Sequence, residues 1–140
     1  MTRQKLPFIR KSADENLTQK GAYVISDAKA GRMATLIATG SEVALALTAQ
    51  QQLLEQGVDV AVVSMPSWEL FEKQTQEYKA GVLGNAPKIS VEASNPFGWE
   101  RFANKCIGIN HFGYSGPAEK VFKKAGLDVE NVIQAVMDMI

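Results

Sequence analysis

One stretch of the chain, residues 33–43, restricts its possible folds more than any other. It reads Met33-Ala-Thr-Leu-Ile-Ala-Thr-Gly-Ser-Glu-Val43, a mostly apolar run that is too short to cross a membrane and that breaks at Gly40-Ser41. Apolar residues then recur at helical spacing, so the stretch predicts a buried strand followed at once by a helix. A second apolar run, residues 58–67, comes directly after Gly57. Strand, helix and strand in this order predict a right-handed crossover and a parallel sheet, whose ligands lie at the carboxyl ends of its strands.

Composition narrows the class of protein. A chain of 140 residues is long enough for one domain with a substantial core. Its 15 basic and 15 acidic side chains cancel, which argues against a nucleic acid or an anionic membrane as partner. The single cysteine, Cys106, cannot form an internal disulfide, and no apolar stretch approaches the ~20 residues of a membrane span. The polar start also lacks the apolar core of a signal peptide, so we expect a soluble protein of the cytoplasm.

The remaining strands complete a mixed sheet. Residues 21–25 predict a short strand, and the turn after it is too short for a crossover helix. We therefore expect this strand to pair antiparallel with strand 33–39 at an edge of the sheet. Residues 88–92 and 106–109 predict two further strands. The expected fold class is α/β, with three layers, α/β/α, around a five-stranded, mostly parallel sheet that has one antiparallel edge strand.

The first expected helix spans residues 41–56. Ser41 can cap its free amides and Gly57 can end it. Gln50 interrupts the apolar face of this helix without overturning the helical pattern.

Three further helices are expected. The second begins at the cap Ser67 and ends near Gly81 or Gly84, and the third opens at Pro117. The last follows the cap Asp128, and its apolar residues keep the helical period closely, which predicts a helix docked on the core.

Few residues offer chemistry by themselves. One cysteine and one histidine cannot supply a structural zinc site. His111 follows the predicted strand 106–109, where a general base could lie, but no nucleophile motif accompanies it, and a polar loop histidine is the simpler interpretation. Cys106 fits a small buried core residue. Trp99 could anchor a contact with another domain or pack within its own, and the sequence leaves both open.

The turn Thr39-Gly-Ser-Glu42 offers free helix amides to an anion. It is far short of a phosphate-binding loop, however, and the carboxylate of Glu42 opposes a phosphate. An ordinary helix start competes with a binding site here. Because no complete catalytic set appears along the chain, we expect the domain to work as part of something larger.

Three segments, Ile37–Val43, Val62–Ser67 and Phe71–Gln74, resemble the carboxy-terminal domain of the transketolase family. The resemblance continues in the same order to the end of the chain, through Ser90–Ala93, Gly98-Trp99, Ile107-Gly108, Phe112-Gly113, Pro117-Ala118, Gly126 and Glu130–Val132. Related thiamine diphosphate enzymes usually have a proline-leucine-aspartate after the second strand, so Ser64-Met-Pro-Ser67 disfavours an association domain from another of those enzymes. Ser115-Gly-Pro117 departs mildly from the family, in which many members have alanine before this proline.

The resemblance implies how the chain is divided and what surrounds it. Residues 1–20 would be a linker from a preceding pyrimidine-binding domain, and residues 21–140 the carboxy-terminal domain. Arg3, within Thr2-Arg-Gln4, would contact the phosphate of a sugar phosphate substrate, as a guanidinium fork can. The domain itself would hold no catalytic, cofactor-binding or metal-binding residue.

The resemblance also implies an activity for the whole enzyme. Thiamine diphosphate and Mg²⁺ would lie on the preceding domains, and a homodimer would transfer a two-carbon ketol unit between ketose and aldose phosphates in the pentose phosphate pathway. The carboxy-terminal domain would supply scaffold and subunit contacts and be inactive alone. The alternative hypothesis is a free-standing regulatory module that binds a small anion at Gly40-Ser41.

Overall fold

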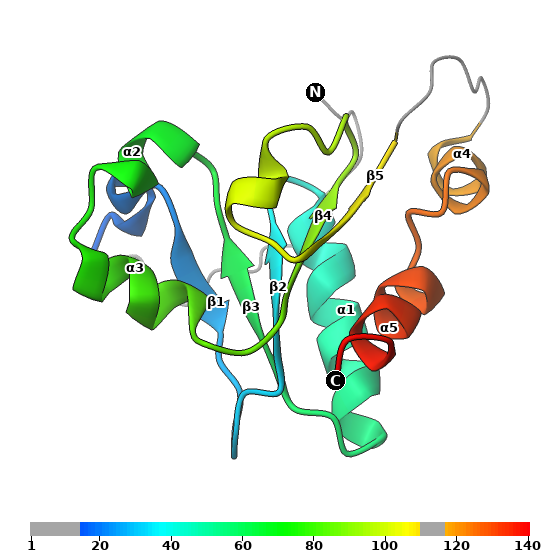
Figure 1. Cartoon of the computed structure of the whole chain (residues 1–140). Coiled ribbons are helices and arrows are strands. Elements are labelled where there is room, and N and C mark those ends of the chain that lie inside the picture. Colours follow the sequence, from blue (N-terminus) through cyan, green and yellow to red (C-terminus); the bar gives the residue numbers. More distant parts are fainter. Residues whose placement is uncertain (1–14, 110–116) are drawn as a thin grey trace.

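A five-stranded sheet lies at the centre of the computed structural model, which describes residues 15–109 and 117–140 (Figure 1). Its spatial order is β1-β3-β2-β4-β5. Neighbouring strands run parallel except at one edge, where β1 is antiparallel to β3. This arrangement confirms the expected α/β class and the single antiparallel edge strand. The strands are β1 (Tyr23–Ser26), β2 (Ala34–Ala38), β3 (Val60–Ser64), β4 (Lys88–Glu92) and β5 (Lys105–Gly108).

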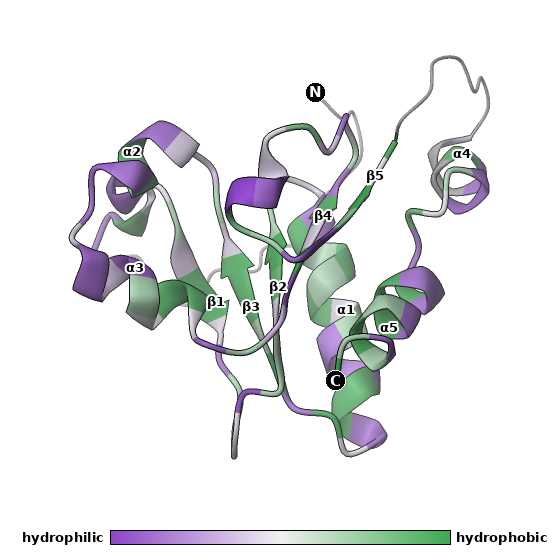
Figure 2. Ribbon diagram, in the orientation of Figure 1, coloured by the Kyte–Doolittle hydropathy of each residue, from purple (hydrophilic) through white to green (hydrophobic). Residues whose placement is uncertain are grey.

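Helices cover both faces of the sheet, which gives the expected three layers. On one face α1 and α5 pack over a core that includes Leu36, Leu53 and Val136, all fully buried. On the other face lie α2, α3 and the short helix η2, around Ile37 and Phe71. Figure 2 shows the central strands in the green of apolar residues and much of the outer helical surface in purple. The helices are η1 (Leu17–Lys20), α1 (Glu42–Glu55), α2 (Trp68–Glu72), α3 (Gln76–Leu83), η2 (Trp99–Arg101), α4 (Ala118–Lys124) and α5 (Val129–Met137).

The order of the strands places a switch point between β2 and β4. Helix α1 connects β2 to its parallel neighbour β3, whereas α2 and α3 lead back past β2 to β4 on its other side. Because parallel crossovers keep one hand, connections that run in opposite directions lie on opposite faces of the sheet. The carboxyl ends of β2 and β4 therefore flank the crevice at which such sheets most often bind ligands.

The predicted partner of the first strand is wrong. Strand β1 pairs with β3, with Tyr23 opposite Ser64, because β3 and β4 occupy both sides of β2. The connection from β1 to β2 passes the amino end of β3, where one carboxylate oxygen of Asp59 accepts the N–H groups of Lys29 at 2.8 Å and Ala30 at 2.6 Å. These hydrogen bonds, that of Ala30 above all, hold the pKa of Asp59 below its usual value. The turn residues predicted that the chain reverses here, but not that hydrogen bonds to Asp59 would fix the position of the connection.

The second predicted helix is two helices. Ser67 caps α2 as expected, its hydroxyl accepting the N–H of Leu70 at 3.3 Å. The chain then leaves helical geometry at Thr75 (φ −61°, ψ 151°), whose hydroxyl accepts the N–H of Tyr78 at 3.1 Å and starts α3. A threonine cap at this point makes a second helix start that the apolar pattern did not reveal. Gly84 follows α3, as the predicted stop required.

Helix α1 begins differently from the prediction. Ser41 has helical backbone angles and accepts no helix N–H, and its hydroxyl instead donates to a carboxylate oxygen of Glu42 at 2.5 Å. Ser41 therefore occupies the N-cap position, as predicted, but the capping hydrogen bond expected of its side chain is absent. The predicted stop at Gly57 is confirmed, since this residue takes φ +79° directly after the helix. Gln50, the polar interruption, donates to the carbonyls of Val60 at 2.8 Å and Ser26 at 3.4 Å, and so joins α1 to two strands.

The final helix is docked, as predicted. Asp128 caps α5 by accepting the N–H of Asn131 at 2.9 Å. Val132 and Val136 are fully buried against α1 and the sheet. In the parts of the chain that the structure describes, every helix is too short or too polar to cross a bilayer.

Candidate functional site

Two carboxylates occupy the switch point of the sheet. The turn after β2 passes through Gly40, at φ +58°, and leads to Glu42 at the start of α1. Glu42 is 6% exposed although it is charged. Glu92 ends β4, the neighbouring strand, and is half-buried. The carboxyl ends of β2 and β4, where the sequence suggested an anion site, are therefore followed or ended by acidic residues.

The two acids influence one another. Burial raises the pKa of Glu92, and the negative charge of Glu42 raises it further. The hydroxyl of Ser41 donates to Glu42 and is therefore not available as a donor to a phosphate. A turn with this charge repels an anion, because like charges at short range in a partly buried site are costly. The ordinary helix start is thus the better of the two interpretations of this turn.

Aromatic side chains build a rigid cluster behind the same edge. Trp99 is 3% exposed and meets Trp68 edge to face, with ring centroids 5.0 Å apart. Phe102 lies 5.9 Å from Trp68 and 6.4 Å from Trp99. Gly98 has φ +90°, and a Cβ atom there would stand 2.7 Å from the Trp68 ring, so only glycine fits. Of the two roles open to Trp99, the structure shows packing within its own domain.

The residue that faces outward is Phe97, which sequence reasoning passed over. Its side chain is 83% exposed. The loop that carries it is fixed from both sides, since the Phe97 N–H donates to the side chain of Asn95 at 2.9 Å and the Gly98 N–H to that of Glu100 at 2.8 Å. The motif Asn-Pro-Phe-Gly between a strand and a tryptophan was the available signal: a turn sequence with a large apolar residue at its tip.

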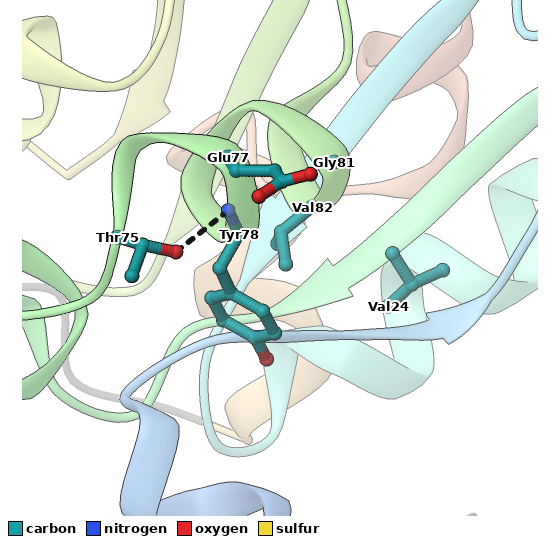
Figure 3. A pocket seen from close by; sticks show the side chains of 6 residues that line it. All are labelled: Val24, Thr75, Glu77, Tyr78, Gly81 and Val82. Carbon is teal, nitrogen blue, oxygen red and sulfur yellow. Dashed lines mark hydrogen bonds between the residues drawn. The ribbon is translucent and has the colours of Figure 1, made fainter.

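Three of the surface cavities that the described residues form lie away from Glu42 and Glu92. The largest, about 470 Å³, lies between β1 and α3 (Figure 3). Tyr78 projects into this region from α3 and its hydroxyl donates to the carbonyl of Ala22 at 2.8 Å. Burial raises the pKa of Tyr78. The lining, which is mainly apolar, consists of Val24, Thr75, Glu77, Tyr78, Gly81 and Val82.

The other two cavities are smaller and more polar. One of about 350 Å³ lies between β5 and α5 beside Cys106, which is half-buried, and beside the ion pair of Lys105 with Asp138 at 3.2 Å. One of about 300 Å³ lies between α2, α3 and η2, and Lys79 and Arg101 are part of its lining. In none of the three does a hydrogen bond among the described residues join a nucleophile to a base.

Two sequence candidates, Arg3 and His111, lie outside the described residues, so the roles considered for them stay predictions. Within residues 15–109 and 117–140, no three side chains of the metal-ligating types gather into a group.

Comparison with known proteins identifies the domain. A family model described as the transketolase-like TK C-terminal domain matches residues 21–128. The chain belongs to the transketolase family. Over its whole length it is 39% identical to a transketolase of Sinorhizobium medicae and 43% identical to one of Bacillus subtilis, and it covers 21% and 22% of those proteins.

Solved transketolases share the fold. A transketolase from Pichia stipitis in complex with sedoheptulose 7-phosphate superposes on 98% of the chain with a TM-score of 0.90 and 37% identity. The match covers 20% of that protein. The chain thus spans about a fifth of the length of the transketolases it matches and corresponds to their C-terminal domain. The family and the domain expected from the sequence are both confirmed.

Proposed function

We propose that this transketolase C-terminal domain works as the scaffold and association part of a longer thiamine diphosphate enzyme. That enzyme, as a homodimer in the cytoplasm, would transfer a two-carbon ketol unit between ketose and aldose phosphates in the pentose phosphate pathway. The observation that carries the proposal is the extent of the match: essentially all of this chain aligns with about a fifth of each relative. Thiamine diphosphate and Mg²⁺ would be held by the remaining four fifths.

The chemistry of the switch point supports a non-catalytic role. The negative charges of Glu42 and Glu92 at the carboxyl ends of β2 and β4 would repel a phosphorylated substrate or cofactor. The P. stipitis relative was solved with a sugar phosphate, which supports the same class of substrate for the whole enzyme. Arg3 remains the residue of this chain proposed to contact that phosphate.

The geometry of the carboxyl edge supports a docking role. The chain reaches the sheet through η1, and the carbonyl of Gly21, just after η1, accepts the N–H of Ser67 at 3.0 Å beside the carboxyl end of β3. Phe97 projects from the same edge, because its loop follows β4 and Gly98 rests on Trp68. An exposed aromatic residue is a typical interface anchor, so Phe97 is the residue that we propose to contact the preceding domains.

An activity assay tests the proposal directly. The 140-residue chain, supplied with thiamine diphosphate and Mg²⁺, is expected to show no turnover of xylulose 5-phosphate with ribose 5-phosphate and no heat of thiamine diphosphate binding. A chimera that carries this chain in place of the matching fifth of the B. subtilis transketolase is expected to be active. Turnover by the 140-residue chain alone would refute the scaffold role.

The docking role has its own test in the chimera. Phe97→Ser is expected to lower the stability or the activity of the chimera while leaving the melting temperature of the 140-residue chain unchanged. An equal loss in both proteins would show that Phe97 acts within its own domain. Reading the codons upstream of Met1 for a thiamine-binding region tests the same proposal at the level of the gene.

The regulatory module with an anion at Gly40-Ser41 is the weaker candidate. Its turn carries the buried Glu42, which accepts the hydroxyl of Ser41 and acts electrostatically on Glu92. It would require that a thermal shift produced by a sugar phosphate or a nucleotide disappear in Ser41→Asp. We expect Ser41→Asp to leave any such shift unchanged.

A further inference from the structure

The 300 Å³ cavity between α2, α3 and η2 has a lining whose charge differs from that of the whole chain. Its charged residues are Lys79 from α3, Lys88 at the start of β4, Arg101 from η2 and, as the one acid, Glu72. The chain as a whole has equal numbers of acidic and basic residues. Three cationic side chains around one carboxylate therefore make this cavity a local positive site.

The two lysines keep most of their hydrogen-bonding capacity. The ammonium of Lys79 donates to the backbone carbonyl of Glu72 at 3.4 Å, and that of Lys88 donates to the carbonyl of Ala86 at 3.1 Å. Both partners are neutral, and within residues 15–109 and 117–140 neither lysine forms an ion pair. Because an ammonium has three donors, each lysine can still donate to an incoming ligand.

Arg101 is held in place by aromatic rings more than by an acid. Its guanidinium lies 5.4 Å from the ring centroid of Trp68 and 5.1 Å from that of Phe102. The nearest oxygen of Glu72 is 3.9 Å away, at the outer limit of an ion pair, and the side chain of Arg101 remains 54% exposed. A stacked guanidinium keeps its fork of N–H donors available for an oxyanion.

The wall behind these charges is apolar. Phe71 is fully buried, Phe102 is 7% exposed, and Leu83 packs in the same cluster. A volume of about 300 Å³ is at the small end of the range for ligand-binding cavities. The combination suits a ligand with a doubly charged head and a small body that can lie against rings.

We propose that this cavity binds a small phosphate monoester, with its phosphate among Lys79, Lys88 and Arg101 and its organic part against the half-buried Leu83 and the edge of Phe102. The excess of two positive charges matches the phosphate dianion near neutral pH. The lining of this cavity includes neither Glu42 nor Glu92, and the inference uses no step of the proposed function, so it does not depend on that function. It would give this domain a binding capacity of its own.

Titrations of the 140-residue chain at low ionic strength test the proposal, with amide NMR shifts as the readout. Phenyl phosphate is expected to bind one to one, to shift the amides of Gly84, Lys88 and Phe102, and to bind at least threefold more tightly than inorganic phosphate. Salt at 0.5 M should weaken the binding because it screens exposed charges. Malonate, a dianion without phosphate, is expected to bind at least threefold more weakly than phenyl phosphate.

Matched variants separate a specific site from general attraction. Lys79→Gln and Lys88→Gln should each weaken phenyl phosphate binding at least fivefold, whereas Lys73→Gln, which removes a lysine paired with Glu69 outside the cavity, should change it less than twofold. Glu72→Gln should tighten binding, and Glu77→Gln, the same charge change on α3 outside this cavity, should not. Melting temperatures confirm that each variant folds.

Three results would overturn the proposal. Absence of saturable binding would show that there is no site. Equal losses in Lys73→Gln and Lys88→Gln would show non-specific attraction to a basic surface. Malonate binding as tight as that of phenyl phosphate would show that the ligand class is wrong.

Discussion

At some positions in this domain, two backbone segments approach so closely that only certain residue types fit. Gly21 is the clearest case, because it combines φ +80° with backbone atoms of Ser67 and Phe71 packed where a Cβ atom would be. Because Gly21 has no side chain, the segment between η1 and β1 can pack directly against the backbone at the start of α2. At Gly31, by contrast, nothing lies within 4 Å of an added Cβ. The same residue type thus has a structural role in one place and little in another.

Gly21→Ala is expected to destabilise the domain by more than about 2 kcal/mol, because it adds a backbone collision to an unfavourable φ. Gly31→Ala, the control, should stay within about 1 kcal/mol of the parent and can be stabilising. Urea unfolding of the two variants measures both effects. Equal stability of the two variants would show that α2 can move away from Gly21.

Glu92→Gln is expected to stabilise the domain near neutral pH. Folding raises the pKa of Glu92, so the ionised carboxylate opposes folding: the penalty is absent below the pKa of the unfolded chain and grows as the pH rises through that of the folded protein. Since the group is half-exposed and screened by water, we expect a gain of no more than about 1 kcal/mol. Unfolding free energies measured from pH 3 to 8 should show the gain at high pH and its loss below about pH 4. A gain that is constant with pH would contradict this explanation.

Helices and strands begin and end at signals that are partly local and partly distant. Asp128 and Ser67 cap their helices through their side chains as their sequence positions predicted, whereas the side chain of Ser41 accepts no helix N–H and donates a hydrogen bond to Glu42. Strand β1 depends on a residue distant in sequence, since Asp59 accepts hydrogen bonds from the N–H groups of the connection that follows the strand. Local sequence patterns therefore predicted where helices and strands lie along the chain, but they were less successful in predicting which strands pair and which groups form hydrogen bonds.

Asp128→Ala is expected to cost about 1 kcal/mol of stability, because the N–H of Asn131 loses its acceptor at the start of α5. Asp128→Asn keeps a side-chain oxygen there and should lose less. Thermal unfolding followed by circular dichroism compares the two. If both variants lost the same amount, the charge of Asp128 and not its hydrogen bond would be the cause.

On the scale of the whole molecule, burial on both faces of the sheet holds the three layers together. Leu53 shows this best: it is fully buried where α1 meets the sheet and α5. Leu53→Ala is expected to cost about 2–5 kcal/mol, through lost burial and the cavity left behind. Leu70→Ala, the same change at a residue that is 38% exposed, should stay within about 1 kcal/mol. Chemical denaturation measures the free energy of unfolding of both variants. Similar losses of stability would mean that the α1–α5 layer is not part of the cooperative core.

The sequence by itself determined the layers of this domain, its mostly parallel sheet, most helix ends and its family. The layers, the sheet and the helix ends follow from the period of apolar residues, from caps and from glycines, all of which act within a few positions along the chain, whereas the family came from the resemblance of whole segments. Only the tertiary structure decided that β1 lies beside β3, that Glu42 and Glu92 close the switch point, and that Lys79, Lys88 and Arg101 surround one cavity. Each of these depends on residues that are distant in sequence and are brought together by the packing of separate elements, a proximity that no local pattern encodes.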